Sequence, residues 1–554
     1  MTLIVVTAAQ PTDTRRLTRP ALSLLRSPGV SHWMIVDASR TALPAAVRGL
    51  LRLRGITCTT DRDASVVADA VRNDDAWVCF LRAGDRLAAN AVRRIADAVA
   101  DPVRDAAVAT GDGLSVVDNV VNNVGDDVVD DIIDIVYGDT RHLVRHADRL
   151  PTFQRRPGWS PERLRHHDYI GAMIAVRAGH LRTVGDVAEL ARRDSHDRNL
   201  RLTERAARVV RVAHAMHETP ERSLAPMASR DAVVDHLARM GIDADVTGDD
   251  LSSTVHVRRR ITTRPLVSVL VPTRGSTATI FGKPRTLVVE AVRSVLATST
   301  YRELEFVVVA DTDTPQAVRD ELRIVGGERL RIVDFDRPFN FAEKINLAAA
   351  HARGELFLLL NDDTEVISPD FLDTLVALLS DDGVGMVGPT LLFEDGTIQS
   401  AGHVFSPEPT DLYRGAPANS RGAHDMLRVT RETSSIIAAC ALTPREVFES
   451  VGGLSVQFPG NWNDIDYCLK VRQSGRRVLV TPLARMYHFE SKTRVPVLVE
   501  SEVAKLGHRW GHVLDDDPYF NPHLQRYVNV WKTDSTSPRS YSEALGPTAP
   551  IASK

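Results

Sequence analysis

The feature that most constrains the fold is an internal duplication, in which one series of motifs occurs twice in the same order. An apolar run that ends at Thr7 recurs at Thr273, and a run that leads to Asp85 recurs before Asp363. The other matching pairs are Asp37 with Asp311, Val184 with Val451, Asp197 with Asp466, and His217 with His488. All of these spacings lie between 266 and 278 residues. The pattern predicts two tandem copies of one domain.

Each copy alternates apolar runs with segments of helical periodicity. In the second copy we expect a buried strand at 265–273, a helix at 286–296 and a strand at 305–311. The succession of strand, helix and strand is typical of a nucleotide-binding half-sheet. The sequence therefore predicts an α/β protein with two Rossmann-like domains.

Changes in composition suggest where the domains begin and end. We expect a first domain at 1–222, a helical linker at 223–263, a second domain at 264–532, and a disordered Ser-, Pro- and Ala-rich tail at 533–554. The linker has helical spacing that is closed by Gly241 as a C-cap. Its basic run, 258–260, favours a solvated segment over contact with anionic lipid.

The composition excludes several classes of function. A net charge of −4 gives no basic surface for nucleic acid, and no nucleic-acid-binding motif is present. The four cysteines are scattered without a CxxC pair, which argues against a zinc site and fits a reducing cytosol. No apolar run reaches the roughly 18 residues needed to cross a bilayer. We expect a cytoplasmic protein that contacts the inner face of the cell membrane peripherally at most.

The stretch from Glu355 to Thr364 places acids where α/β enzymes bind ligands. An unbroken apolar run, 356–360, has the character of a strand buried on both faces, and Asp362 and Asp363 follow it. Ligands bind beyond the carboxyl ends of such strands, and carboxylates there suit Mg²⁺ or Mn²⁺. A helix N-cap explains this stretch alone about equally well. Asp311, at the end of another strand, could likewise bind a base or ribose, or cap a loop.

Further motifs in the second copy resemble the family 2 glycosyltransferases of the GT-A fold. They occur in family order between about 264 and 525: Phe339–Asn346, Leu359–Val366, Asp395–Gly402, Val451–Leu454, Asn463–Lys470, Tyr487–Arg494 and Asp517–Pro522. The first copy resembles the front domain of tandem, polysaccharide-assembling members through Tyr137–Asp139, Pro157–Pro161 and Tyr169–Gly171. The resemblance implies two tandem GT-A-like domains.

The resemblance also implies a reaction. A hydroxyl of a cell-surface glycan or lipid-linked saccharide would displace the nucleotide of a UDP- or dTDP-sugar at the anomeric carbon, with inversion. Asp464 occupies the position of the family's general base. Asp363 and His488 resemble its ligands for Mn²⁺ or Mg²⁺, which would neutralise the departing diphosphate. The residues implied for donor binding are Pro272, Thr273, Arg274, Asp311, Lys344 and Asp362.

Three residues beside the base are candidates for acceptor binding. Trp462 could stack on a sugar ring, although core packing explains it equally well. Asn463 directly precedes the base. Asp466 lies two residues beyond it, on a different side of a helix, and is interpreted as a structural or an acceptor-side carboxylate.

The first copy lacks most of this chemistry. Arg82, Ala83 and Gly84 stand before Asp85 where the family has acids, and Ser195 stands at the base position. A guanidinium beside the metal position would repel a cation. We therefore expect the first domain to be a noncatalytic scaffold or an acceptor-binding module.

Three other functions are compatible with parts of this pattern. A nucleotidyltransferase acting on sugar phosphates shares the half-sheet and the metal-binding acids, but it needs no histidine near 488. A noncatalytic glycan-assembly protein is disfavoured by the intact Asp363, Asp464 and His488. A polymerase with two working sites is disfavoured by Arg82 and Ser195.

Overall fold

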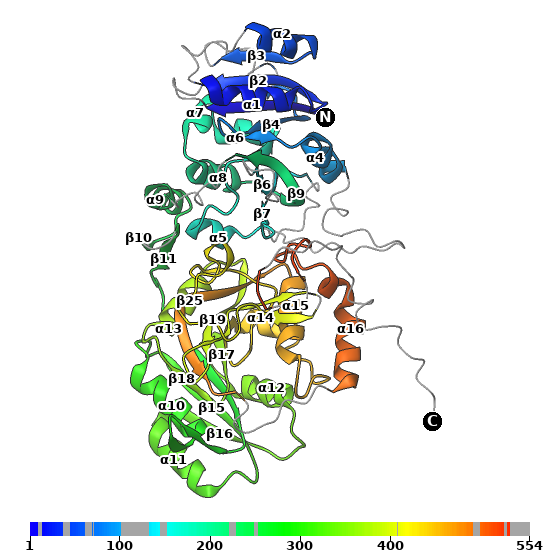
Figure 1. The fold of residues 1–554 in the computed structure, drawn as a ribbon. Coiled ribbons are helices and arrows are strands. Elements are labelled where there is room, and N and C mark those ends of the chain that lie inside the picture. Colours follow the sequence, from blue (N-terminus) through cyan, green and yellow to red (C-terminus); the bar gives the residue numbers. More distant parts are fainter. Residues whose placement is uncertain are drawn as a thin grey trace, which may run out of the picture.

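A computed structural model shows the fold of the chain (Figure 1). The residues that it describes are 1–8, 14–36, 45–60, 69, 71–100, 132–143, 152–220, 229–248, 253–406, 408–490, 499–525 and 529–531. The predicted tail at 533–554 lies outside them. Among the described residues, no helix combines the length and the apolar character required to span a bilayer.

Two large mixed sheets share one strand order. The first sheet runs β3-β2-β1-β4-β8-β6-β9-β5, and the second runs β16-β15-β12-β17-β24-β19-β25-β18. The strands of the first are β1 (Thr2–Ala8), β2 (Val30–Val36), β3 (Thr57–Thr60), β4 (Ala76–Phe80), β5 (Arg86–Leu87), β6 (Ile135–His142), β8 (Ile174–Arg177) and β9 (Val209–Thr219). Those of the second are β12 (Val267–Thr273), β15 (Leu304–Asp311), β16 (Leu330–Phe335), β17 (Leu356–Leu360), β18 (Thr364–Val366), β19 (Val384–Leu392), β24 (Cys440–Pro444) and β25 (Arg477–His488).

Strand directions match as well as strand order. β1 is parallel to β2 and β4, as β12 is to β15 and β17. β4 is antiparallel to β8, as β17 is to β24, and β6 is parallel to β9, as β19 is to β25. The predicted α/β fold with two related domains is confirmed.

Helices and short strands complete the two halves. The helices are α1 (Thr14–Leu24), α2 (Ala45–Leu53), α4 (Ala91–Ala100), α5 (Pro161–His166), α6 (Ala178–Val184), α7 (Val187–Arg192), α8 (Ser195–Thr203), α9 (Arg230–Arg239), α10 (Leu287–Thr298), α11 (Gln316–Gly326), α12 (Phe341–His351), α13 (Phe371–Leu378), α14 (Arg445–Ser450), α15 (Asn463–Gln473) and α16 (Glu500–Asp515). The short strands are β7 (Thr152–Gln154), β10 (Ala244–Gly248), β11 (Val255–Arg259), β13 (Thr277–Ile280), β14 (Lys283–Thr286), β20 (Ile398–Ser400), β21 (His403–Phe405), β22 (Pro409–Asp411) and β23 (Arg431–Glu432).

The central strands of the second sheet are apolar because both of their faces are covered. In β17 all five side chains are buried. Leu358 joins a core cluster that includes residues of α10, and Phe357 joins the cluster that includes residues of α12. This alternation is the period of two expected of a strand. The direction of β17 then decides which edge of the sheet carries the residues that follow Leu360.

The segment predicted as a helical linker holds α9 followed by the β10–β11 hairpin, which lie at the side of the first half in Figure 1 and pack on its core. Gly241 ends the helix with a φ of 68°, as its position as a C-cap predicts. The basic run is not a solvated segment throughout, because the Arg259 side chain is only 3% exposed and is ion-paired with Glu162. Arg258 pairs with Asp370 at 2.6 Å.

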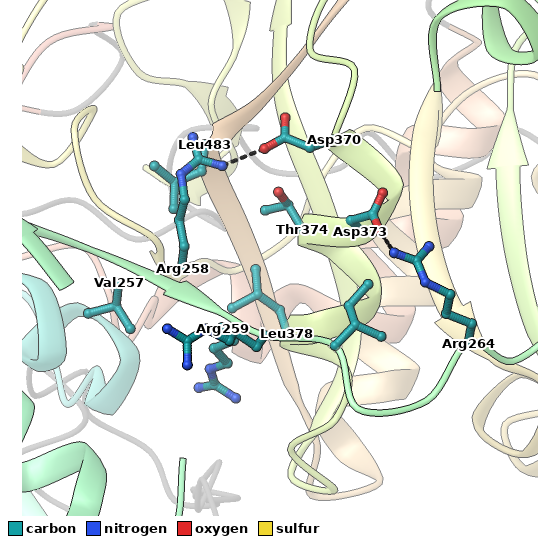
Figure 2. Close-up of a pocket in the computed structure, with 11 residues that line it drawn as sticks. Val257, Arg258, Arg259, Arg264, Asp370, Asp373, Thr374, Leu378 and Leu483 are labelled. Carbon is teal, nitrogen blue, oxygen red and sulfur yellow. Dashed lines mark hydrogen bonds and ion pairs between the residues drawn. The ribbon is translucent and has the colours of Figure 1, made fainter. Parts of the chain in front are cut away.

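Figure 2 shows the hollow between β11 and α13 that these arginines line. In it Arg258 reaches Asp370, and Arg264 reaches Asp373 at 2.6 Å. Arg260, which also lines the hollow, pairs with Asp243 at 2.8 Å. The basic run is therefore paired with acids of the chain itself.

A buried set of charges joins the two halves. Glu162 of α5 pairs with Arg165 and Arg259, and Glu432 of β23 pairs with Arg477 at 2.8 Å. Glu432 also accepts hydrogen bonds from the Ser160 hydroxyl and, at 3.1 Å, from the Glu162 N–H. Asp381 lies 2.6 Å from Arg477 and 3.9 Å from both Arg165 and Arg259. Three acids and three arginines thus neutralise one another at the junction, which we call the junction network.

Candidate functional site

The candidate site lies where four strands of the second sheet end. Because β12, β15 and β17 are parallel neighbours, Thr273, Asp311 and Asn361 reach the same edge of the sheet. β18 pairs with β25 so that Thr364 lies opposite His488. That register brings Asp363 to His488, although the two residues are 125 positions apart in the sequence.

Asp363 and His488 make the contact on which the predicted metal site depends. The His488 Nε2 atom lies 3.3 Å from Asp363 Oδ1, and the Phe489 N–H donates to the Asp363 carbonyl at 2.9 Å. Burial disfavours the imidazolium, but the Asp363 carboxylate outweighs it and raises the pKa of His488. Burial likewise opposes the carboxylate, but His488 outweighs it and lowers the pKa of Asp363.

The donor set fits a divalent cation. Ligand atoms at about 2.1 Å from one ion lie about 3 Å apart in octahedral geometry, which is close to the observed separation. His488 Nδ1 lies 2.8 Å from Gln399 Oε1. This contact makes Nδ1 the protonated nitrogen and leaves Nε2 available as a ligand. Within the described part of the chain, the buried Oδ1 of Asn361 accepts no hydrogen bond, and the Asn361 amide nitrogen lies 3.3 Å from His488 Nε2.

The protein would supply only part of a coordination sphere here. Within the described ranges, no group of three or more His, Cys, Asp or Glu side chains could hold an ion. The remaining ligands would have to come from water and from a substrate, as is usual where Mg²⁺ binds phosphates.

Four of the residues predicted to bind the donor are linked to one another. The Thr273 hydroxyl donates to Asp362 Oδ2 at 2.6 Å. The buried Lys344 ammonium donates to the Thr273 carbonyl at 2.9 Å and lies 2.6 Å from Asp311 Oδ1. Burial and the neighbouring Asp363 charge raise the pKa of Asp362 to about 7. Of the other two predicted residues, Pro272 is buried within β12, and Arg274 is exposed beside Ser276.

The predicted base stands at the start of α15, in partly buried surroundings. Asp464 accepts hydrogen bonds from the backbone N–H groups of Ile465, at 2.8 Å, and Ala438. Burial raises its pKa, a shift that suits a general base. Trp462, two residues earlier, has a left-handed φ of 63°, which is rare for a bulky residue and is typical of functional sites.

Comparison with known proteins identifies this half of the chain. Residues 264–512 match the family model described as "Glycosyltransferase like family 2". These residues belong to the family 2 glycosyltransferases.

Relatives extend the similarity beyond the glycosyltransferase domain. The chain is 30% identical over 525 residues to the O-antigen biosynthesis protein RfbC of Myxococcus xanthus, covering 89% of this chain and 38% of that protein. It is 31% identical over 423 residues to the uncharacterized protein y4gI of Sinorhizobium fredii, covering 70% of this chain and 45% of that protein. The chain therefore spans less than half the length of these relatives.

Solved structures share part of the fold at low similarity. One is GalNAc-T7 with UDP, GalNAc and Mn²⁺, at 16% identity and a TM-score of 0.35 over 46% of this chain and 49% of that one. Another is the mannosyltransferase PcManGT of Pyrobaculum calidifontis with GDP-Man and Mn²⁺, at 22% identity and a TM-score of 0.32 over 45% of this chain and 64% of that one.

The three candidates for acceptor binding in the family 2 glycosyltransferase domain lie in different surroundings. Asp466 is fully buried, accepts from Trp510 Nε1 at 2.9 Å and lies 3.0 Å from Arg509, so it ties α16 to α15. Of the two roles predicted for Asp466, these contacts favour the structural carboxylate over the acceptor-side one. Asn463 is buried and donates weakly to the Phe458 carbonyl. Trp462 packs on a cluster that includes Phe458, and its buried Nε1 has no hydrogen-bond partner among the residues that the structure describes.

The first copy holds an arginine where the glycosyltransferase domain has its acid pair. Arg82 Nη2 lies 3.1 Å from Asp85 Oδ1 and donates to the Thr219 hydroxyl at 2.9 Å. His217 Nε2 lies 3.8 Å from Asp85 Oδ2. The Ser195 hydroxyl, at the position of the base, donates to Asp168. A protein cation thus already neutralises Asp85.

Sequence reasoning missed five polar residues that surround the site, namely Gln399, His403, Asp411, Arg414 and Glu490. Gln399 falls in the Asp395–Gly402 motif that carries the family resemblance, so its motif was available as a signal. Asp411 and Arg414 lie in a stretch without periodicity, where single polar residues carry no recognisable pattern.

Proposed function

We propose that this chain is a metal-dependent, inverting glycosyltransferase, which transfers a sugar from a UDP- or dTDP-sugar to a hydroxyl of a cell-surface glycan or a lipid-linked saccharide. The observation that carries the proposal is the 3.3 Å approach of His488 to Asp363, beside the linked donor residues, within a family 2 domain. The name of the Myxococcus relative, an O-antigen biosynthesis protein, supports glycan assembly as the setting.

In this proposal the residues of the site divide the work. Asp363 and His488 would hold Mn²⁺ or Mg²⁺, which supplies Lewis-acid neutralisation of the diphosphate. Thr273, Asp362 and the Lys344–Asp311 pair orient the nucleoside. Asp464 takes the proton of the acceptor hydroxyl as its oxygen bonds to the anomeric carbon. The bond from that carbon to the diphosphate oxygen breaks on the opposite face, so the configuration inverts and the nucleoside diphosphate leaves with the bonding electrons.

The front domain, for which we propose the boundaries 1–222, would then be noncatalytic. The Arg82–Asp85 pair supports this assignment, because a guanidinium at 3.1 Å leaves that carboxylate unsuited to a divalent cation.

Two substitutions test the proposal against one control. Asp464→Asn should abolish transfer, yet calorimetry should still show metal-dependent donor binding. Asp363→Ala should weaken donor binding and remove its dependence on Mn²⁺. Asp382→Asn, which changes an exposed carboxylate on the same domain, should alter neither. A panel of nucleotide-sugars, scored by thermal shift with and without Mn²⁺, identifies the donor beforehand.

Three results would reject the proposal. The first is donor affinity that is insensitive to chelator, which removes the metal assignment. The second is full turnover by Asp464→Asn, which removes the base. The third is release of pyrophosphate instead of nucleoside diphosphate, which indicates a nucleotidyltransferase.

A further inference from the structure

A continuous set of polar contacts leads from His488 toward the base. The Gln399 amide, whose oxygen contacts His488, donates to Glu490 Oε2 at 3.1 Å, and Arg414 lies 2.6 Å from the same oxygen. Arg414 also lies 3.8 Å from Asp411 Oδ2. His403 Nε2 lies 3.4 Å from Asp411 Oδ1. We call the five residues Gln399, Glu490, Arg414, Asp411 and His403 the polar bridge.

His403 ends this bridge in a fixed orientation. Its side chain is buried, and Nδ1 lies 3.0 Å from the Ser435 hydroxyl while Nε2 faces Asp411. Its backbone N–H donates to the Ser435 carbonyl at 2.8 Å, and its carbonyl accepts from the Thr433 hydroxyl at 2.7 Å. A histidine held at both ring nitrogens and both backbone groups cannot rotate without breaking several hydrogen bonds.

The base is attached to the same segment of chain. Asp464 accepts from the Ala438 N–H, and Ser435, three residues earlier, holds His403. Phe405 of β21 packs in one apolar cluster with Ile465 of α15, so β21 lies directly against the start of the base's helix. The His403 imidazole and the Asp464 carboxylate are therefore both anchored to the chain segment from Ser435 to Ala438.

Charge complements this geometry. The charged groups that face Asp464 are His403 from β21 and Asp411 from β22, and those that face His403 are Asp411, Asp464 and Arg414. Burial lowers the pKa of His403, but Asp411 and Asp464 outweigh it and raise the pKa. The thiol of Cys468, also on α15, stays neutral because burial raises its pKa. His403 is thus the charged side chain that favours the ionised form of Asp464, beside the backbone N–H groups of Ile465 and Ala438.

We propose that His403 is a positioning residue for Asp464, whose cation, oriented by Asp411 and Ser435, keeps the base ionised and directed at the acceptor hydroxyl. The inference rests on the proposed function. Nothing in it requires His403 to touch the substrate.

The test is the pH profile of kcat/KM for His403→Gln, with His351→Gln, an exposed histidine of the same domain, as control. Losing the cation raises the pKa of Asp464, so the base is protonated at a higher pH. We expect the acid limb to move upward by about one pH unit, as a lost opposite charge close by would cause. Activity should therefore fall roughly tenfold at low pH and much less at high pH. Metal-dependent donor binding should stay unchanged, and the control profile should overlay the parent.

A second variant keeps the inference testable if His403→Gln fails to fold. Ser435→Ala keeps the imidazole but removes its Nδ1 partner, and it should shift the acid limb in the same direction by a smaller amount. An acid limb that coincides with the parent, or a loss of equal size at every pH, would overturn the inference. That result, combined with inactive Asp464→Asn, rejects only the role of His403. Full turnover by Asp464→Asn would reject the proposed function as well.

Discussion

Removing one carboxylate from the junction network should uncouple the two halves of the chain. Glu432 is fully buried and accepts hydrogen bonds from Ser160, the Glu162 N–H and Arg477. Glu432→Ala removes the acceptor that these three buried donors share, and only Arg477 keeps a second carboxylate. Breaking a buried ion pair from one side costs about 3–5 kcal/mol. Because Arg477 keeps Asp381 at 2.6 Å, we expect the lower end of that range, about 3 kcal/mol.

Calorimetry measures this effect. About 3 kcal/mol corresponds to a fall of roughly 6 °C in the Tm of a domain of this size. Because the junction network connects the two halves, the Glu432→Ala variant should also unfold in two distinct transitions, one for each half. Glu449→Ala provides the control, because Glu449 is 62% exposed and lies 3.6 Å from Arg445. It should change stability by less than about 0.5 kcal/mol.

The double variant tests whether the network acts as a unit. Arg477→Met in the Glu432→Ala background removes the cation left behind, so it should cost less than Arg477→Met in the parent. The reasoning would be refuted if Arg477→Met lowered the free energy of unfolding equally in both backgrounds. It would also be refuted if the Tm of Glu432→Ala lay within about 1 °C of the Tm of the control.

Three further predictions concern single side chains. Asp85→Ala should leave turnover within about twofold of the parent, because Arg82 already neutralises that carboxylate; a loss of tenfold or more would mean that the front domain takes part in catalysis. Trp510→Phe removes the donor to the buried Asp466 and should lower stability by about 1–3 kcal/mol in urea unfolding, while the KM for donor stays constant. Burial opposes ionisation of Glu162, but Arg259 and Arg165 outweigh it and hold the pKa of Glu162 well below its usual value. The ionised carboxylate therefore stabilises the folded state fully above the unfolded pKa of about 4.3, and this stabilisation is lost as the pH falls through the folded pKa. The difference in unfolding free energy between the parent and Glu162→Gln should therefore shrink below about pH 4, and a difference independent of pH would contradict this account.

Much of the second sheet could be predicted because its strands are buried on both faces. The run Leu356–Leu360 shows this burial directly in its composition, and the polar residues Asn361, Asp362 and Asp363 follow where the strand ends. The approach of His488 to Asp363 followed from family resemblance and not from local pattern, because antiparallel pairing between distant strands leaves no periodic signal.

The junction network could not be predicted for a different reason. Single charged residues such as Glu162 and Arg259 are usually solvated, and nothing in their neighbours indicates that a second domain covers them. The network draws its residues from five separate segments, namely α5, β11, β23, β25 and the position of Asp381. The same holds for His403 and Asp411, whose partners become visible only once β21 and β22 are paired.

The arginine beside Asp85 gives that carboxylate a positive charge that belongs to the chain itself. A guanidinium is bound covalently to its own backbone, so no chelator can withdraw it and no shortage of metal can empty the position. The front half thus carries, at the ends of its strands, a counter-charge that the gene itself encodes.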